Sequence, residues 1–125
     1  MVKKILFVCL GNICRSPAAE GIFKKKVKDR ELENLFVVDS AGTGGWHVGN
    51  LADRRMREAA LSRGIELTSR SRKIDHNDLY EFDHILVMDQ DNFDDVQSYI
   101  DEETSIVSVD TFNEALNLIS EYSSR

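Results

Sequence analysis

A strand-length run of apolar residues near the start of the chain leads directly into a loop and a helix signal. Residues 5–8 (Ile-Leu-Phe-Val) end at Cys9, and Arg15, Ser16 and Pro17 follow a short glycine-containing segment. Ser16 suits a helix N-cap and Pro17 suits the first helical turn. The stretch therefore predicts a buried strand that delivers Cys9 to the carboxyl edge of a sheet, where open α/β folds bind ligands.

The rest of the chain continues this alternation of strands and helices. We expect further strands at residues 35–38, 84–88 and 106–109. We expect helices at residues 17–28, 53–63, 91–100 and 111–122, the second of them ended by Gly64. This pattern predicts an α/β fold with a Rossmann-like, four-stranded parallel sheet and helices on both faces. At 125 residues the chain has room for one domain, residues 1–125, and not for a second.

Composition and charge narrow the class of protein. The net charge of −6 argues against general affinity for nucleic acid, and no apolar run approaches membrane-spanning length. The first apolar run is too short for a signal peptide, so we expect a cytoplasmic protein. The two cysteines lie close together, as in a site and not in a disulfide framework. Because histidine, cysteine and carboxylate ligands are not clustered, we expect neither a metal nor another cofactor.

The segment after Cys9 has the chemistry of an anion-binding loop. A loop of this length between a strand and a helix curls so that successive backbone N–H groups point inward, and the helix aims its positive end at the same place. Arg15 adds a planar guanidinium that grips two phosphate oxygens. The predicted phosphate-binding residues are Leu10, Gly11, Asn12, Ile13, Cys14, Arg15 and Ser16. Together they predict a site for a phosphate-sized dianion above Cys9.

Cys9 is the candidate nucleophile of this site. The thiolate is the reactive form of cysteine, and N–H donors, a helix N-terminus and a guanidinium all favour it. Such a thiolate attacks phosphorus and forms a cysteinyl-phosphate, which water then cleaves, while the N–H groups and Arg15 stabilise the transferred group. The alternative is that Cys9 is a small buried hydrophobic residue. The strand before it, with Gly11, Ser16 and Pro17 after it, favours the nucleophile.

The run of residues 8–20, Val-Cys-Leu-Gly-Asn-Ile-Cys-Arg-Ser-Pro-Ala-Ala-Glu, closely resembles the signature of low-molecular-weight protein tyrosine phosphatases. The resemblance continues through residues 39–43, 46–49, 53–55, 63–65 and 82–89. It implies a single parallel-sheet domain that hydrolyses phosphotyrosine in proteins, and small aryl phosphates, without a cofactor.

The resemblance also implies roles for individual residues. Cys9 corresponds to the nucleophile and Arg15 to the residue that grips the phosphate. Asn12, Ser16 and Ser40 correspond to residues that hold the loop in shape, and a serine helps to stabilise the thiolate.

Three further residues have two interpretations each. Cys14 either forms a reversible disulfide with Cys9 that prevents over-oxidation, as the resemblance also suggests, or packs beneath the loop. Trp46, whose family counterpart lines the substrate cleft, either stacks on the phenyl ring of an aryl phosphate or covers the core. Asp89, just past the third predicted strand, either helps to orient the loop or Arg15, or is a structural turn residue.

The histidines and the basic runs have plainer interpretations. We expect His47, His76 and His84 to face solvent, and nothing pairs His47 with Cys9 as an acid. The arginines at positions 54, 55 and 57 and the basic residues among 70–73 make an acidic protein locally basic. Such runs steer anionic substrates or form a solvated surface, and we favour the solvated surface.

The general acid of the family is missing from its usual place. A tyrosinate leaving group needs a proton, and such an acid contributes on the order of a hundredfold to ten-thousandfold in rate. The family carries it in an Asp-Pro-Tyr-Tyr-like segment after the fourth strand, whereas Pro17 is the only proline of this chain. The domain thus looks shortened after that strand. Ser69 also stands in place of the histidine that the family has in the Ser40 network, so we expect the tuning of the thiolate to differ.

Asp110 is the strongest remaining candidate for the acid. It ends the fourth predicted strand at the ligand edge of the sheet. The alternative is that Asp110 caps the helix that follows it. Asp91, Asp94 and Asp95, on a predicted surface helix, are weaker candidates.

Three functions compete for this sequence. The first is a phosphatase that acts on phosphotyrosine in proteins or on small aryl phosphates. The second is an arsenate reductase, which shares this fold and loop but needs further cysteines, and the chain has only Cys14 beyond Cys9. The third is a phosphate- or phosphotyrosine-binding module without catalysis. A pure binding module has no need of the Cys9 thiol, so the sequence favours the phosphatase.

Overall fold

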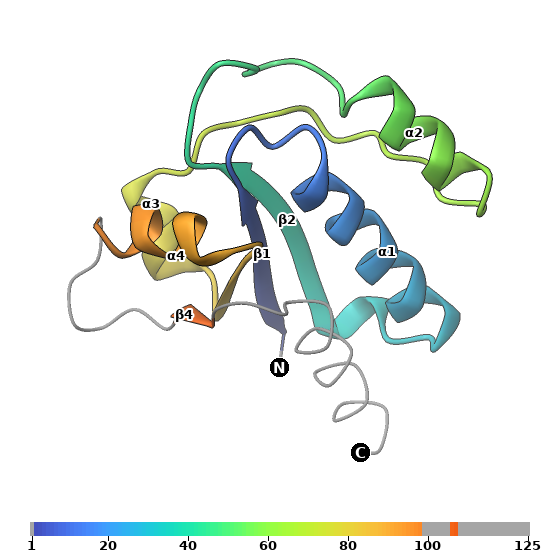
Figure 1. Cartoon of the computed structure of the whole chain (residues 1–125). Coiled ribbons are helices and arrows are strands. Elements are labelled where there is room, and N and C mark those ends of the chain that lie inside the picture. Colours follow the sequence, from blue (N-terminus) through green and yellow to red (C-terminus); the bar gives the residue numbers. More distant parts are fainter. Residues whose placement is uncertain (1, 99–105, 108–125) are drawn as a thin grey trace.

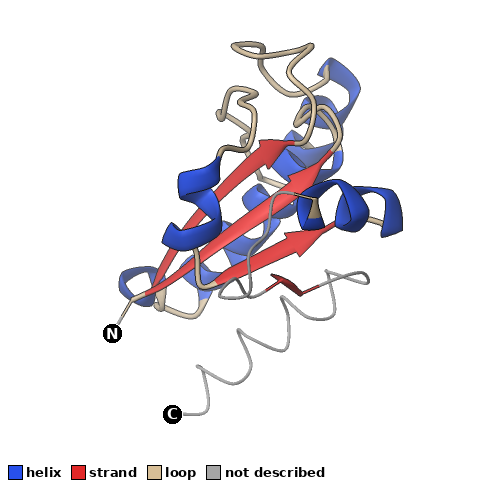
Figure 2. Cartoon of the chain, turned by 90° about the vertical axis from the view of Figure 1, so that its left-hand side faces the viewer, coloured by secondary structure: helices blue, strands red, loops and turns tan. Residues whose placement is uncertain are grey.

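The computed structural model describes residues 2–98 and 106–107. Within them, the strands form one sheet in the order β2-β1-β3-β4, and all neighbouring strands are parallel (Figure 2). The strands are β1 (Lys3–Cys9), β2 (Phe36–Gly42), β3 (His84–Val87) and β4 (Ile106–Val107). The predicted four-stranded parallel sheet is confirmed.

Strand β1 occupies a central position because its sequence is apolar on both faces. Residues 5–9 are all buried, and β1 pairs with β2 on one side and β3 on the other. The register sets Cys9 opposite Gly42 and Val8 opposite Val87. Three strands therefore end together at the carboxyl edge, and Cys9 lies at this edge.

Helices cover both faces of the sheet, as predicted. They are α1 (Arg15–Asp29), α2 (Arg54–Leu61), α3 (His76–Glu81) and α4 (Gln90–Gln97), with a short 3-10 helix, η1 (Glu33–Leu35), before β2. Figure 1 shows α1 on one side of the strands and α3 and α4 on the other. No helix among the described residues is long and apolar enough to span a membrane.

The pleat of β1 divides the core into two clusters. Ile5 and Phe7 face α1, where Phe23 makes edge-to-face contacts with Phe7 and Phe36 at centroid distances of 5.8 and 5.3 Å. Leu6 and Val8 point to the opposite cluster with side chains of α3 and α4. Each fully buried side chain of this kind contributes about 1.5–3 kcal/mol relative to an exposed one. The two clusters hold α1 and α4 close to the edge where Cys9 lies.

Some predicted boundaries differ from the structure. Helix α3 was not predicted, because its six residues are too short for a helical period; its signal is the pair Asp75 and Asp78, which form a capping box. Strand β2 extends further than predicted, to Gly42, so Ser40 lies within it. Asp110 and the helix predicted at residues 111–122 lie outside the described residues.

Candidate active site

The loop after Cys9 is held by donors from surrounding segments. Three of its carbonyl groups, and the carbonyl of Cys9 itself, accept hydrogen bonds from the segments that follow β2, precede α2 and precede α3. The bonds run from Thr43 N to Cys9 O (2.9 Å), from Gly44 N to Leu10 O (2.9 Å), from the Ser71 hydroxyl to Gly11 O (2.9 Å) and from Asp53 N to Ile13 O (2.6 Å). The loop carbonyls therefore point outward, away from the space above Cys9.

The backbone N–H groups of the same loop remain available. Among the described residues, no hydrogen bond uses the N–H groups of Gly11, Ile13 or Cys14, and the N–H group of Asn12 donates to Cys9 Sγ at 3.3 Å. The first N–H groups of α1, which begins at Arg15, add to this set. Because the carbonyl groups of the loop point outward and its N–H groups point inward, the loop forms a concave site for an anion.

The buried side chain of Asn12 links the loop to three neighbouring segments by hydrogen bonds. Its backbone has a φ of +55°, a left-handed conformation that asparagine tolerates better than most residues. Its Nδ2 donates to Ser16 Oγ (2.8 Å) and Ser40 Oγ (2.9 Å), and its Oδ1 accepts from the backbone N–H of Arg72 (3.0 Å). All three side-chain contacts are to groups of other segments, so this one buried amide ties the loop to α1, β2 and the segment before α3.

Ser16 points at the thiol, and its predicted role as a helix N-cap is wrong. Helix α1 begins one residue earlier, at Arg15, and no side chain caps it. Ser16 Oγ lies 3.0 Å from Cys9 Sγ and already accepts a hydrogen bond from Asn12. Its hydroxyl hydrogen is therefore free to point at sulfur. Two hydrogen-bond donors, the Ser16 hydroxyl and the Asn12 N–H, then face Cys9 Sγ.

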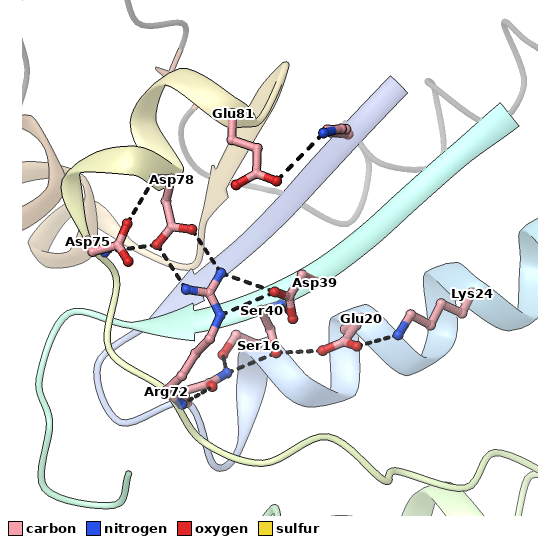
Figure 3. A network of polar contacts seen from close by, with 11 residues as sticks. Ser16, Glu20, Lys24, Asp39, Ser40, Arg72, Asp75, Asp78 and Glu81 are labelled. Atoms are coloured by element: carbon pink, nitrogen blue, oxygen red, sulfur yellow. Dashed lines mark hydrogen bonds and ion pairs between the residues drawn. The ribbon is translucent and has the colours of Figure 1, made fainter. Parts of the chain in front are cut away.

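A buried carboxylate supports Ser40 from behind. The Ser40 hydroxyl accepts from Asn12 and donates to Glu20 Oε1 at 2.6 Å, and Glu20, which is 4% exposed, pairs with Lys24 (Figure 3). Ser69 is half-buried, and no described hydrogen bond joins it to Ser40. In this protein Glu20 is therefore the charged partner that Ser40 contacts.

Arg72 does not lie in a solvated basic run, as the sequence had indicated. Its guanidinium is half-buried, forms two hydrogen bonds with Asp78 (2.9 and 3.0 Å) and donates to Asp39 at 3.1 Å (Figure 3). Burial alone lowers the pKa of Arg72, but the hydrogen bonds and charges of Asp78 and Asp39 outweigh it and raise that pKa above its usual value. The same residue gives its backbone N–H to Asn12, so this ion-pair cluster positions the loop.

Arg15 and Asp89 form an ion pair across the carboxyl edge of the sheet. Arg15 Nη1 lies 2.8 Å from Asp89 Oδ2, and the other oxygen of Asp89 accepts the N–H of Asn92 at 2.8 Å as the N-cap of α4. The Asn92 N–H and Arg15 both lower the pKa of Asp89. Asp89 thus contacts Arg15 and at the same time caps the first turn of α4. Both of its predicted interpretations, a partner of Arg15 and a structural turn residue, describe part of what it does.

Cys14 is a free, half-buried thiol, and Cys9 is also free. Burial raises the pKa of Cys14, and the nearby negative charges of Asp53 and Cys9 raise it further against the smaller opposing effects of Arg15 and Arg55. Cys14 therefore favours its neutral form. A reversible disulfide with Cys9 stays a prediction.

Trp46 and His47 border the loop. Trp46 is 73% exposed, so the alternative in which it covers the core is wrong, while its role in a substrate cleft stays a prediction. His47 is half-buried, and a Cβ at Gly11 would lie only 3.1 Å from its Cδ2. The expectation that His47 faces solvent is wrong in this respect, since its ring packs against the loop.

The acidic candidates on α4 lie on its exposed side. Asp94 accepts from Gln90, whereas Asp95 Oδ2 lies 3.5 Å from the hydroxyl of Thr43. Among the described residues, no group of three or more histidine, cysteine or acidic side chains could hold a metal ion.

Sequence reasoning missed Glu20, Ser71, Arg72 and Asp78 as parts of this site. Glu20 carries a signal that could have been used: it lies on the buried face of α1, four residues after Ser16 and three before Phe23. Chain folding brings Ser71 to Gly11 and Arg72 to Asn12 and Asp39, and no local pattern predicts these contacts.

Comparison with known proteins identifies the family. The family model described as "Low molecular weight phosphotyrosine protein phosphatase" matches residues 4–118. The chain belongs to this family.

Individual relatives agree with the family match. The chain is similar to a putative low molecular weight protein-tyrosine-phosphatase of Synechocystis sp., with 51% identity over 90 residues, covering 72% of this chain and 57% of that protein. It is 44% identical over 96 residues to the low molecular weight phosphotyrosine protein phosphatase of Gallus gallus, covering 77% of this chain and 61% of that protein. These matches span less than two thirds of the length of either relative.

A solved structure extends the similarity. The crystal structure of a protein tyrosine phosphatase from Entamoeba histolytica, with Hepes in its active site, superposes with a TM-score of 0.83 and 34% identity. The superposition covers 97% of this chain and 92% of that chain.

Proposed function

We propose that this chain hydrolyses aryl phosphates, above all phosphotyrosine in proteins, through a cysteinyl-phosphate formed on Cys9. One observation carries the proposal: Cys9 Sγ faces the Ser16 hydroxyl and the Asn12 N–H beneath a loop whose carbonyls are bonded outward. A thiolate held under such donors is both a nucleophile and the floor of a phosphate site. The same proposal treats residues 1–125 as one domain, and places it in the cytoplasm, where free thiols persist.

The reaction has two steps. In the first, Cys9 Sγ bonds to phosphorus while the bond from phosphorus to the tyrosine oxygen breaks, and that oxygen takes a proton from a general acid. In the second, a water oxygen bonds to phosphorus, the phosphorus–sulfur bond breaks, and the water's proton returns to the acid. The N–H groups of the loop and Arg15 stabilise the three equatorial oxygens in both steps.

The contact with Asp89 uses only Nη1 of Arg15, which leaves Nε and Nη2 for a bidentate grip on two phosphate oxygens. The Arg15–Asp89 pair lies at the surface, so breaking or sharing it costs about 1 kcal/mol or less. Asp89 thereby holds Arg15 at the rim of the loop when no phosphate is bound.

We assign the general acid to Asp110, because the chain has no Asp-Pro-Tyr-Tyr-like segment. The test is the ratio of kcat/KM for p-nitrophenyl phosphate to that for phosphotyrosine, since nitrophenolate leaves without a proton and tyrosinate does not. We expect D110N to lose roughly a hundredfold on phosphotyrosine and much less on p-nitrophenyl phosphate. The matched control is D94N on α4, which should leave the ratio unchanged. An unchanged ratio in D110N would remove Asp110 from the mechanism.

Cys9→Ser separates a phosphatase from a binding module. The substitution should abolish turnover of both substrates while the variant still binds phosphate, because the N–H groups of the loop remain. Turnover that survives in C9S, or its absence from the wild type, would contradict the proposed mechanism.

A further inference from the structure

The beginning of α2 is attached to the rim of the loop. Asp53 N donates to Ile13 O at 2.6 Å, and the Asp53 carboxylate caps α2 by accepting the N–H groups of Arg55 (3.1 Å) and Met56 (3.3 Å). At the opposite end of the loop, Leu10 O accepts from Gly44, two residues before Trp46. A substrate seated on the loop therefore has Trp46 toward one end and the first turn of α2 toward the other.

Arg55 is the basic side chain of this turn that other groups leave available. Arg54 pairs with Glu58 at 3.3 Å, and Arg57 donates to the carbonyl of Ala52 at 2.9 Å. Arg55 is exposed, and within the described part of the chain its guanidinium has no ion pair or hydrogen bond. Arg55 comes two residues after Asp53, whose backbone N–H is bonded to Ile13 O on the rim of the loop. A free cation thus lies beside the loop of a protein with a net charge of −6.

We propose that Arg55 binds the carboxylate of an acidic residue that flanks the phosphotyrosine, so that acidic phosphopeptides are the favoured substrates. This inference rests on the proposed function. The tyrosine phosphate occupies the loop, and a neighbouring glutamate or aspartate of the peptide reaches the guanidinium at the start of α2. A guanidinium matches a carboxylate in a planar, bidentate geometry. The attraction acts at an exposed rim, so it favours acidic over neutral peptides by roughly two- to fivefold.

The experiment compares phosphotyrosine peptides that are identical except for glutamate or glutamine at the positions flanking the phosphotyrosine. The quantity measured is the ratio of kcat/KM for the glutamate peptide to that for the glutamine peptide, at low and at high salt. We expect the wild type to prefer the glutamate peptide by roughly two- to fivefold at low salt, mainly through KM, and to lose the preference as salt rises.

Three variants test the residue. R55Q should bring the ratio to about one, and R55E should reverse it, because a like charge then faces the peptide. R63Q is the matched control, because Arg63 is also an exposed arginine and lies just beyond the other end of α2, and it should keep the wild-type ratio. A wild-type ratio near one, or a preference that survives in R55Q, would overturn the inference.

Turnover of p-nitrophenyl phosphate by the wild type distinguishes a failure of the inference about Arg55 from a failure of the proposed phosphatase function. If the wild type hydrolyses this substrate but shows no preference between the peptides, the inference about Arg55 fails and the proposed function stands. If the wild type hydrolyses neither, the proposed function fails, and the inference fails with it.

Discussion

At the scale of single residues, Asn12 combines a costly backbone conformation with three hydrogen bonds. Asn12→Ala removes all three and forces a β-carbon with no polar group into the left-handed region. It leaves the Arg72 N–H unsatisfied, at a cost of about 1–3 kcal/mol, and alanine tolerates the left-handed conformation less well than asparagine does. We expect a free energy of unfolding lower by several kcal/mol and a fall in kcat/KM for p-nitrophenyl phosphate. Urea unfolding and steady-state kinetics measure the two effects.

Asn12→Gly is the control for this prediction. Glycine adopts a positive φ without strain, so N12G loses the hydrogen bonds and adds only the larger entropy of glycine in the unfolded chain, roughly 0.5–1 kcal/mol. N12A should therefore be less stable than N12G by about 1 kcal/mol. An N12A variant more stable than N12G would contradict a strained backbone conformation at residue 12.

The raised pKa of Cys14 predicts a slow reaction with alkylating agents. In a C9S background, native Cys14 should react with iodoacetamide more slowly at neutral pH than the same cysteine in the urea-unfolded chain, because only the thiolate reacts. A thiol whose pKa is raised on folding stabilises the fold below its unfolded pKa. That stability is lost as pH rises through the higher folded value. After correction for the different solvent exposure of Cys14 in the two states, equal alkylation rates in the native and unfolded chains would contradict the raised pKa.

Local spacing explains which site residues could be predicted. Cys9, Arg15 and the loop between them lie in one short segment, so their proximity follows from the chain itself. The contacts of Ser16 with Cys9 and of Arg72 with Asn12 depend on where α1 starts and on how a distant segment returns. The N-cap prediction failed because Ser-Pro suits two registers of a helix start, and only tertiary contacts select between them.

At the scale of secondary-structure elements, the close approach of β2 to the loop requires a glycine. A β-carbon on Gly42 would lie 2.8 Å from Leu10 O and 3.1 Å from Gly11 C, both backbone atoms. Gly42→Ala should therefore displace the loop, with a loss of stability of about 1–3 kcal/mol and a fall in kcat. The measurements are thermal unfolding and hydrolysis of p-nitrophenyl phosphate.

Gly45→Ala, in the same connection, is the matched control. The nearest atom to a β-carbon on Gly45 is on the Lys73 side chain at 3.7 Å, an ordinary contact. G45A should change stability by less than about 0.5 kcal/mol. A G42A variant as stable and active as G45A would show that β2 does not constrain the loop.

The helices and strands themselves were predictable where their pattern of apolar residues continues over many positions. Strand β1 and helix α1 carry complete patterns, and the structure shows both close to their predicted positions. Helix α3 has only Asp78 and Leu79 buried, so its sequence has no periodic stripe to detect. Its position matters nonetheless, because Asp78 is the partner that holds Arg72.

At the scale of the whole molecule, the loop connects parts of the fold that are distant in sequence. Its carbonyls and Asn12 are bonded to β2, to the start of α2 and to the segment before α3, while Cys9 continues the central strand between both core clusters. An anion that binds the loop therefore binds only the folded state, and its binding free energy adds to the free energy of unfolding.

Inorganic phosphate should consequently raise the melting temperature in a saturable way. At a phosphate concentration of a hundred times Kd, the added stability is about 2.7 kcal/mol. Sodium chloride at matched ionic strength is the solvent control, since it reproduces the screening without filling the site. Arg15→Met should weaken the effect by removing one charged phosphate ligand, whereas Arg63→Gln, just beyond the far end of α2, should leave it unchanged. A melting temperature that rises equally in phosphate and in chloride would mean that the loop binds no phosphate, because an anion held by its N–H groups has to distinguish the two salts.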